Sequence, residues 1–376
     1  MSTPQATGRP KKRKKKKRLP AWVHPLPYAG VRAVSAGANL AGVERSMGAM
    51  RRVGQGFGGL PMNRERLERA VMNIRWCFPE KVEEACRDLA LSAYRHLFML
   101  ASEVCCTPSL ITPESVLEFV EFDGVDRALG MLRSGRPALL VTGHCGNWEL
   151  MGAALASVGI PVHALYRPLD MKPLDRWVQR VRRGQGIELV DKFGAAERLP
   201  AILDDGLPVG FIADQNAGDK GLFVPFFDRM ASAYKTIGVL AMQYRAPVIC
   251  GHAMRLAGDD PAHPRFRYRV SVTDIITEED WSGQDDAVFY ITARYRRAIE
   301  QMVRAAPEQY LWMHRYWKSR PRHERMTKPF PGRLRDKVAA LPWMNEERVT
   351  RIVERSAIDG PAWREANPHK IPKPSG

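Results

Sequence analysis

The stretch PALLVTGHCGNWELMGAALASV, residues 137–158, changes its pattern half-way along. Residues 137–142 are a short apolar run, which predicts a buried strand, and residues 147–158 have the pattern of a helix. His144 stands between them, with a glycine on one side and another two positions later. The stretch therefore places an imidazole at a strand-to-helix corner where small residues leave room for a substrate.

Strands and helices continue to alternate after this corner. We predict strands at 162–166, 187–190, 208–213 and 247–254, with helices at 174–184, 195–206, 234–245 and 286–305. The run 266–274 predicts a further strand at an edge, whereas the periodicity of 64–121 predicts helices before the first strand. This alternation predicts an α/β fold: a mainly parallel central sheet flanked by helices, with an N-terminal helical region.

Basic residues are concentrated at the start of the chain. The 376 residues carry a formal net charge of +17, and nine positive charges fall within residues 1–18, which contain no acid. Since like charges repel and nothing apolar offsets the loss of chain entropy, we expect residues 1–20 to form a disordered polybasic tail. The remaining body keeps a net charge of +8, which favours an acidic partner or surface.

Three further segments follow this tail. Residues 21–60 mix apolar, small and basic residues, which predicts an amphipathic helical segment close to a membrane. A helix packed on the protein body is an equally good interpretation of the same pattern. Residues 61–325 predict one domain, and residues 326–376 predict a C-terminal extension that contains a helix.

The cysteines and the hydropathy pattern exclude several classes of protein. The six cysteines form no C-x-x-C pair and no small disulfide framework, so we expect reduced thiols of a cytosolic protein. The basic start is not followed by the apolar region of a secretory signal, and no run of about 18 apolar residues predicts a membrane-spanning helix. A nucleophilic pair of His144 and Cys145 is not expected, because adjacent side chains of an extended chain point to opposite sides.

A carboxylate, Glu149, lies five positions after His144. This H-x-x-x-x-E spacing lets the chain turn and bring Glu149 beside the ring. A carboxylate on Nδ1–H would fix the tautomer and leave Nε2 to take a proton from a hydroxyl. Because the spacing is common by chance, it leaves open both a general-base pair and two ordinary loop residues.

Five motifs follow one another in a fixed order along the chain. They are GHCGNWE at 143–149, YRP at 166–168, ADQN at 213–216, VPFF at 224–227 and PEQYLWMHRYWKSRP at 307–321. In this combination, over roughly residues 65–325, the chain resembles the bacterial lipid A acyltransferase family, within the lysophospholipid-acyltransferase-like group. The resemblance implies a glycerol-3-phosphate-acyltransferase-like fold and makes residues 61–325 the acyltransferase domain.

The resemblance implies transfer of a fatty acyl chain from a thioester to a hydroxyl of a glycolipid, either a lipid A precursor or a related glycolipid. His144 is then the general base for direct attack by the hydroxyl, and Glu149 orients it. No acyl-enzyme, cofactor or metal ion is implied, and the sequence shows no convincing cluster of metal ligands.

Other motif residues fall on expected substrate contacts. Asn147 belongs to the first motif, and Arg167 of the second suits a phosphate or carbonyl oxygen, since a guanidinium forms bidentate contacts. Asp214 of the third motif is expected to orient Arg167 or the acceptor sugar, with Gln215 beside it. Structural ion pairs are the alternative for Arg167 and Asp214.

Two aromatic stretches each have two interpretations. The apolar run 221–230 predicts either core or a wall of an acyl-chain groove. In the last motif, Trp312, Tyr316 and Trp317 stand among basic residues, which suits a membrane headgroup layer or a phosphate-bearing substrate. A packed helix with a basic outer face is the alternative for this motif.

The charge also predicts partners and location. Acyl-carrier protein or acyl-CoA is the expected donor, since both are acidic, and the tail would tether a peripheral protein to the anionic cytoplasmic face of the inner membrane. Two other classes are a nucleic-acid-binding protein that uses the tail and a non-catalytic glycolipid binder. The body has no nucleic-acid motif, so no specific nucleic acid is expected. The intact pair of His144 and Glu149 argues against the non-catalytic binder.

Overall fold

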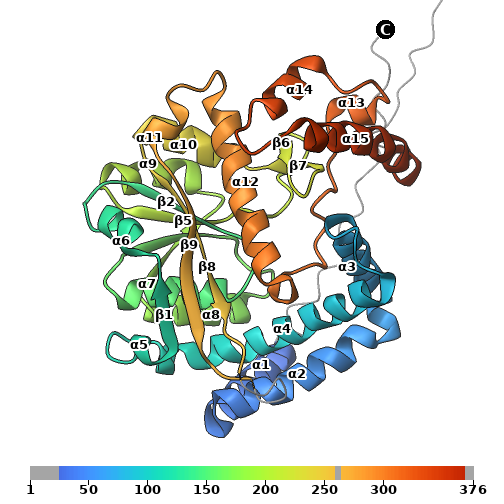
Figure 1. Cartoon of the computed structure of the whole chain (residues 1–376). Helices are drawn as coiled ribbons and strands as arrows, with labels where there is room; N and C mark the ends of the chain where they lie inside the picture. The colour runs from blue at the N-terminus through green and yellow to red at the C-terminus, as the bar shows by residue number, and fades with distance from the viewer. Residues whose placement is uncertain (1–24, 259–263, 369–376) are drawn as a thin grey trace, which may run out of the picture.

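A computed structural model of the chain describes residues 25–258 and 264–368 (Figure 1). Its main strands are β1 (Val120–Asp123), β2 (Ala138–Thr142), β3 (Val162–Tyr166), β4 (Ile187–Asp191), β5 (Pro208–Ile212), β8 (Val248–Arg255) and β9 (Tyr268–Ile276). Within the described residues they form one seven-stranded sheet, in the order β1-β9-β8-β2-β5-β3-β4. Only the pairing of β8 with β9 is antiparallel among these strands, so the predicted mainly parallel α/β fold is confirmed. The predicted tail, residues 1–20, lies outside the described residues.

The central strand β2 is buried on both faces, as its continuous apolar run predicts. Leu139 and Val141 belong to the larger hydrophobic core on one face, and Ala138 and Leu140 belong to a second core on the other. Successive strand side chains point to opposite faces, so both faces need a cover of helices. One cover comprises α9 (Ala195–Asp204), α10 (Thr236–Tyr244) and α12 (Ala287–Ala305), and the other comprises α6 (Asp126–Leu132), α7 (Trp148–Ser157) and α8 (Lys172–Gly184).

The predicted N-terminal helical region is present. It contains α1 (Pro25–Ala41), α2 (Val43–Gly59), α3 (Arg64–Cys77) and α4 (Glu83–Leu110). Helix α2 packs along α4 through Gly54 and Gly58, which lie about one turn apart. A Cβ at Gly54 would lie 2.7 Å from the carbonyl oxygen of Tyr94, so this close approach requires glycine.

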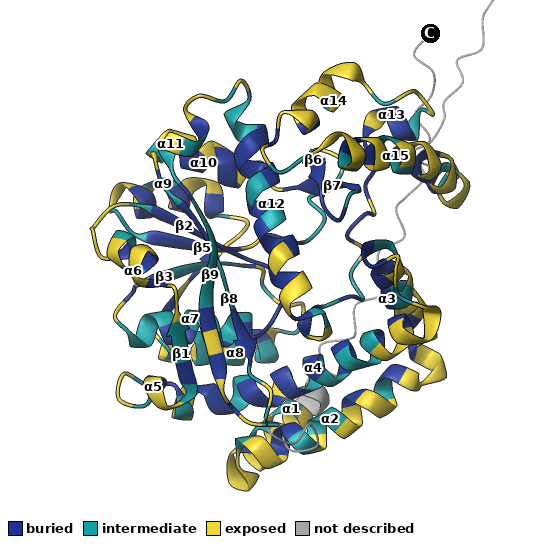
Figure 2. Cartoon of the chain, in the orientation of Figure 1, coloured by how far each residue is buried: buried dark blue, intermediate teal, exposed yellow. Residues whose placement is uncertain are grey.

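The outer face of α1 and α2 is exposed, as Figure 2 shows. One side of α2 packs on the body, as the packed-helix interpretation expects, and its other side faces outward; contact of this segment with a membrane stays a prediction. No helix in the described part of the chain is both long enough and apolar enough to cross a membrane.

Two strand predictions are corrected by long-range pairing. Strand β1 lies at the end of the stretch 64–121 that the periodicity predicted as helical, and it takes the edge position. The predicted edge strand at 266–274 is β9, which pairs with both β1 and β8. The partners β1 and β9 are about 150 residues apart, so no local pattern reveals their pairing.

The two aromatic stretches are largely core. The run 221–230 forms most of a hairpin of β6 (Leu222–Pro225) and β7 (Met230–Ala233), whose Phe226 and Phe227 are buried. The last motif forms turns rather than a helix after η3 (Pro307–Gln309). Trp312, Tyr316 and Trp317 are buried in the larger core, so the headgroup interpretation is wrong for these rings.

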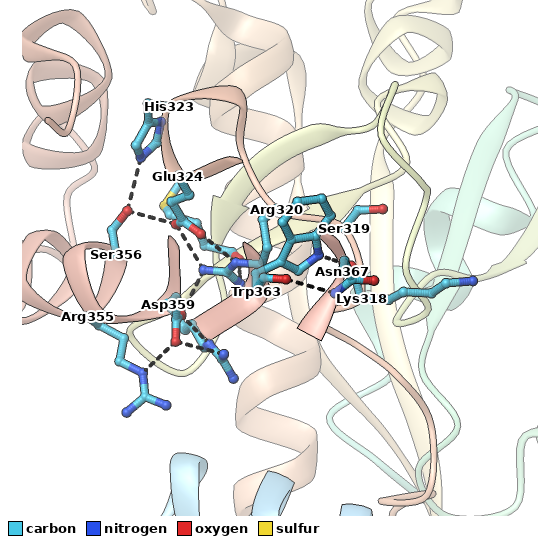
Figure 3. A network of polar contacts seen from close by, with 12 residues as sticks. Lys318, Ser319, Arg320, His323, Glu324, Arg355, Ser356, Asp359, Trp363 and Asn367 are labelled. Atoms are coloured by element: carbon cyan, nitrogen blue, oxygen red, sulfur yellow. Dashed lines mark hydrogen bonds and ion pairs between the residues drawn. The ribbon is translucent and has the colours of Figure 1, made fainter. Parts of the chain in front are cut away.

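The C-terminal extension is joined to the domain by a buried ionic network (Figure 3). The extension contains α14 (Gly332–Ala339) and α15 (Glu346–Ala366), and α13 (Arg322–Arg325) directly precedes it. Arg320, which is 1 % exposed, donates to Glu324 in α13 and, at 2.8 Å, to Asp359 in α15. Asp359 also accepts two hydrogen bonds from Arg229 at the tip of the β6–β7 hairpin. The extension therefore holds the hairpin in place.

Candidate active site

His144 lies two residues beyond the end of β2, in a loop held on both sides. The amide of Gly146 donates to the carbonyl of Gln309, and the amide of Leu311 donates to the carbonyl of His144. Gly146 has a φ of +63°, and a Cβ there would overlap the carbonyl oxygen of Ala253. Only glycine fits this position, and it keeps the His144 backbone close to β8.

Nδ1 of His144 is 2.8 Å from Oδ1 of Asp214, although the residues are 70 positions apart. The side chain of His144 is 15 % exposed, whereas that of Asp214 is fully buried. The carboxylate accepts the proton of Nδ1, which leaves Nε2 of His144 as a hydrogen-bond acceptor. This arrangement leaves Nε2 able to accept a proton, with a carboxylate in place to stabilise the charged ring.

The surroundings of Asp214 keep its carboxylate ionised. Burial raises the pKa of Asp214, but the charge and hydrogen bonds of His144, and then the charge of Arg296, offset burial and lower the pKa to about 2. Arg296 is itself buried and donates to the carbonyl oxygens of Ala213 and Asp214, at 3.1 and 2.6 Å. An ionised Asp214 stabilises positive charge on the ring when Nε2 takes a proton.

Three side chains surround the rest of the His144 ring. The amide nitrogen of Gln215 is 3.5 Å from Nε2 of His144 and 3.1 Å from Nε2 of His314. The indole of Trp148 meets the ring edge to face, with centroids 4.8 Å apart. A contact of 3.5 Å is at the limit of a hydrogen bond, so a substrate hydroxyl can replace Gln215 at Nε2.

Glu149 does not contact His144. Its carboxylate accepts hydrogen bonds from Nε and Nη2 of Arg182 in α8, at 2.8 and 2.5 Å. Glu149 lies in the first turn of α7 and is directed toward α8, and Asp214 already occupies Nδ1 of the ring. The expected contact of Glu149 with the ring is therefore corrected: Asp214 makes it. A catalytic role for Glu149 stays a prediction.

An apolar pocket lies beside this pair. It has a volume of about 90 Å³ and lies between α7 and the strands β2, β3 and β5. Its lining includes Leu140, Leu155 and Phe211, with Glu149 and Arg182 as charged members. Trp148 lines the pocket and also contacts His144, so the ring and the pocket share a wall. A proton acceptor thus stands next to a space suited to hydrocarbon.

The sequence profile of a family described as bacterial lipid A biosynthesis acyltransferase matches residues 34–319, which is most of the chain. The chain belongs to this family. It is therefore an acyltransferase, and the resemblance of the five sequence motifs is confirmed.

Three curated relatives come from Escherichia coli (strain K12). The acyltransferase is 27% identical over 263 residues to lipid A biosynthesis palmitoleoyltransferase. The aligned part covers 69% of this chain and 81% of the relative. It is 25% identical over 277 residues to lipid A biosynthesis lauroyltransferase, and the aligned part covers 72% of this chain and 85% of the relative. For the myristoyltransferase the identity is 23% over 279 residues, with coverages of 72% and 80%. The relatives share a reaction class and differ in the acyl group of their names.

The other predicted site residues lie in different places. Gln215 is beside the ring, as described above. Arg167 directly follows β3, so it lies at the same edge of the sheet; its side chain is exposed and has no ion-pair partner within residues 25–258 and 264–368. Asn147 is fully buried, accepts from the amide of Leu150 and donates to Glu103. Asn147 therefore caps α7 and offers a substrate no exposed surface, which corrects its predicted role.

The surroundings of Cys145 do not favour a nucleophilic thiolate. Burial, and then the charge of Asp214, raise the pKa of its thiol to about 12. The side chain is fully buried, with its sulfur 3.9 Å from the sulfur of Met302. The sequence-based expectation that Cys145 and His144 do not act as a pair agrees with this geometry.

Sequence reasoning missed two residues of the candidate site. His314 lies in the last motif, which was interpreted from its aromatic and basic residues alone. The ring of His314 contacts the amide of Gln215. Arg296 lies within α12, far along the chain from the first motif. One signal for the His144–Asp214 pair was present in the sequence, because each residue follows a predicted buried strand at a similar spacing.

Proposed function

We propose that this acyltransferase moves a fatty acyl chain from an acyl thioester to a hydroxyl group of a glycolipid, with His144 as the general base. The observation that carries the proposal is the hydrogen-bonded pair of His144 and Asp214 beside an apolar pocket, in a chain of the lipid A acyltransferase family. The acceptor is a lipid A precursor or a related glycolipid.

In this mechanism the acceptor hydroxyl replaces the Gln215 amide at Nε2 of His144. As the hydroxyl oxygen bonds to the thioester carbonyl carbon, its proton moves to Nε2, and Asp214 stabilises the imidazolium from Nδ1. The tetrahedral intermediate then breaks its carbon–sulfur bond, and the leaving thiolate takes the proton from Nε2. His144 returns to its neutral form and no acyl-enzyme is formed. General-base help of this kind contributes about 10²–10⁴ in rate.

The apolar pocket is the proposed site for the methylene groups nearest the thioester. At its polar side, Glu149 holds two nitrogens of Arg182, and the ring of Tyr166 lies under the same guanidinium at 5.6 Å. Nη1 of Arg182 has no hydrogen-bond partner in the part of the chain that the structure describes. Glu149 thus acts as a positioning residue, which orients Arg182 toward an oxygen atom of the substrate.

Arg167 is the proposed contact for an anionic or carbonyl oxygen outside the pocket. It follows β3 directly, and β3 ends at the same edge of the sheet as β2 and β5. Since its guanidinium is exposed, it can reach a substrate without disturbing the core.

Attachment to a membrane is proposed through α1, α2 and the basic tail. Val34, Leu40 and Val53 are exposed on these helices, and Leu40 is 89 % exposed. Arg32 and Arg52 are exposed on the same helices. Apolar and basic residues together favour the surface of an anionic membrane. The proposed location is peripheral, at the cytoplasmic face of the inner membrane, with acyl-carrier protein or acyl-CoA as the donor.

The direct test measures transfer of a radiolabelled acyl group to a lipid A precursor by wild type, His144→Gln and Asp214→Asn. We expect both variants to lose most of the activity while their circular dichroism spectra remain unchanged. His163→Gln is the matched control, because His163 lies near the amino-terminal end of β3, whereas His144 lies beyond the carboxyl end of β2. Equal rates for wild type and His144→Gln would end the assignment of the base.

Membrane attachment is tested separately by sedimentation with vesicles that contain anionic phospholipid. Leu40→Glu should reduce the bound fraction, whereas Leu117→Glu in α5 (Val116–Phe119), which is also exposed, should not. Equal binding of wild type and Leu40→Glu would remove the helices from the proposal.

A further inference from the structure

Gln215 and His314 also line a second, larger cleft with a volume of about 570 Å³. The rest of its lining comes from α2, η2 (Pro61–Asn63), α3, α4, Asn216 and the segment 311–318. The Gln215 amide contacts Nε2 of both His144 and His314, so this cleft reaches the edge of the catalytic ring. The apolar pocket meets the same ring through Trp148 instead. Two spaces of different character therefore converge on His144.

The larger cleft is cationic. Among the described residues, its charged lining consists of Arg66, Arg69, Arg315 and Lys318, without a carboxylate. Glu65 lies close by and offsets part of this charge, since it accepts from Arg69 at 2.6 Å and from Arg315 at 3.2 Å.

The remaining cations of the cleft are free for a ligand. Arg66 and Lys318 are exposed, and neither side chain has an ion-pair partner in residues 25–258 or 264–368. Burial, and then the neighbouring charge of Arg315, lower the pKa of Arg69, which is typical of crowded cations. A bound anion would relieve this crowding.

Hydrogen bonds join the walls of the cleft to each other. The side chain of Asn73, buried in α3, donates to the carbonyl oxygens of Trp312 and His314, at 2.8 and 2.9 Å. Asn216 and Ser319 exchange two further hydrogen bonds. Because these contacts hold the segment 311–318 against α3 and Asn216, the cations do not need to be gathered when a ligand binds.

We propose that this cleft binds a phosphate group of a substrate whose reacting end extends past Gln215 to His144. Arginine side chains form bidentate, charge-assisted hydrogen bonds with phosphate, and lysine adds a point charge. The direction of the substrate toward His144 rests on the proposed function, whereas the binding of phosphate does not. The phosphate has two possible sources: the glycolipid acceptor, or the phosphate-bearing arm of the acyl donor.

The first experiment measures binding without turnover. Isothermal titration of inorganic pyrophosphate is carried out at low salt with wild type, His144→Gln, Arg66→Glu, Lys318→Glu and Arg333→Glu. Arg333 is exposed in α14 and lines neither space, so it controls for the change in net charge. Loss of one charge-assisted contact corresponds to roughly a tenfold or greater loss of affinity.

We expect Arg66→Glu and Lys318→Glu to bind pyrophosphate with this lower affinity. His144→Gln and Arg333→Glu should bind it with the affinity of the wild type. Equal weakening by Arg333→Glu, or no saturable binding to wild type, overturns the proposal. Because His144→Gln is inactive under the proposed function but keeps the cleft, failure of phosphate binding is separable from failure of the catalytic assignment.

The second experiment identifies the source of the phosphate. KM is measured for a lipid A precursor with and without its phosphate, and for acyl-CoA against an acyl-N-acetylcysteamine thioester, which has no phosphate. Arg66→Glu and Lys318→Glu should raise KM about tenfold for one phosphorylated substrate, and the difference from wild type should vanish for its phosphate-free analogue. An increase for the precursor assigns the cleft to the acceptor, and an increase for acyl-CoA assigns it to the donor. An equal increase with the phosphate-free analogues contradicts the proposal.

Discussion

His144 and Asp214 occupy equivalent positions on neighbouring strands. Thr142, the last residue of β2, lies opposite Ile212, the last residue of β5, and each member of the pair follows two residues later. Because the strands are parallel, both residues lie beyond the carboxyl ends of the strands, at the same end of the sheet's hydrogen-bonded ladder. There Nδ1 of His144 and Oδ1 of Asp214 are 2.8 Å apart. The register of the two strands therefore brings the imidazole and the carboxylate together.

Asp214→Asn should lower kcat by about 10²–10⁴ with little change in KM. The amide group can donate to Nδ1 and so favours the tautomer that has its proton on Nε2, where the base must be free. Initial rates at saturating substrate measure the loss. Asp219→Asn is the control, because Asp219 follows in the same loop and is 58 % exposed. A loss of less than threefold would show that Asp214 does not steady the base.

Glu149 and Arg182 should behave as a coupled pair that is separate from His144. Glu149→Gln and Arg182→Gln should each lower kcat/KM, and the double variant should be little worse than either, which corresponds to a coupling of about 1–3 kcal/mol. The pH dependence of kcat should stay where it is, since Glu149 does not touch the ring. Additive losses, or a shifted pH profile in Glu149→Gln, would instead connect Glu149 to His144.

Gly210→Leu should change the choice of acyl chain. Gly210 lines the apolar pocket, and a Cβ there would meet no atom closer than 3.7 Å, so the new side chain can enter the pocket. One methylene group in an apolar site is worth about 1–3 kcal/mol, so the preference between chain lengths should move by about tenfold or more. Mass spectrometry of products from mixed donors measures it. Gly184→Leu, at the exposed end of α8, should leave the preference unchanged.

Asp359→Asn should destabilise the whole domain. The substitution removes a carboxylate shared by Arg229 and Arg320, both of which are buried. Breaking a buried ion pair by removing one partner costs about 3–5 kcal/mol, because the other charge stays buried. Urea unfolding measures the loss. Asp336→Asn, at an exposed position of α14, should change the free energy of unfolding by less than about 0.5 kcal/mol.

Acid should weaken the fold through His323. Burial, and then the charge of Arg320, lower the pKa of His323 to about 4, whereas a histidine in the unfolded chain titrates near 6.5. Below pH 6.5 the unfolded chain therefore binds a proton that the folded protein does not. The free energy of unfolding should fall by at most about 1.4 kcal/mol per pH unit until the pH passes about 4.

Urea unfolding between pH 4.5 and 7.5 tests this dependence. His323→Gln should reduce the slope of stability against pH, because glutamine takes up no proton in either state. Burial also lowers the pKa of His252 to about 4, so His252→Gln should reduce the slope in the same way. A slope in His323→Gln that equals the slope of wild type would contradict the assignment of this histidine.

Local periodicity predicted most of the elements that carry the site. The strand at 162–166 is observed with the same bounds, and those at 137–142 and 208–213 differ from β2 and β5 by one residue at one end. Strand β1 and the β6–β7 hairpin were missed, because the first pairs with a distant strand and the second lies in an apolar run that resembles core.

The contacts within the candidate site were predicted less completely than its location. The sequence pointed to His144, Asp214 and Gln215, which the structure brings together. It paired His144 with Glu149, since five positions are close along the chain. The structure instead directs Glu149 to Arg182, because the first turn of α7 faces α8.

The sequence by itself determined the α/β class, the strand-to-helix corner and the family, because these depend on side-chain periodicity and on motifs read along the chain. Only the tertiary structure decided which carboxylate meets the imidazole and that arginines of α3 share a cleft with the segment 311–318. Such contacts join residues 70 or more positions apart, and strand order, register and helix packing set them rather than any local pattern.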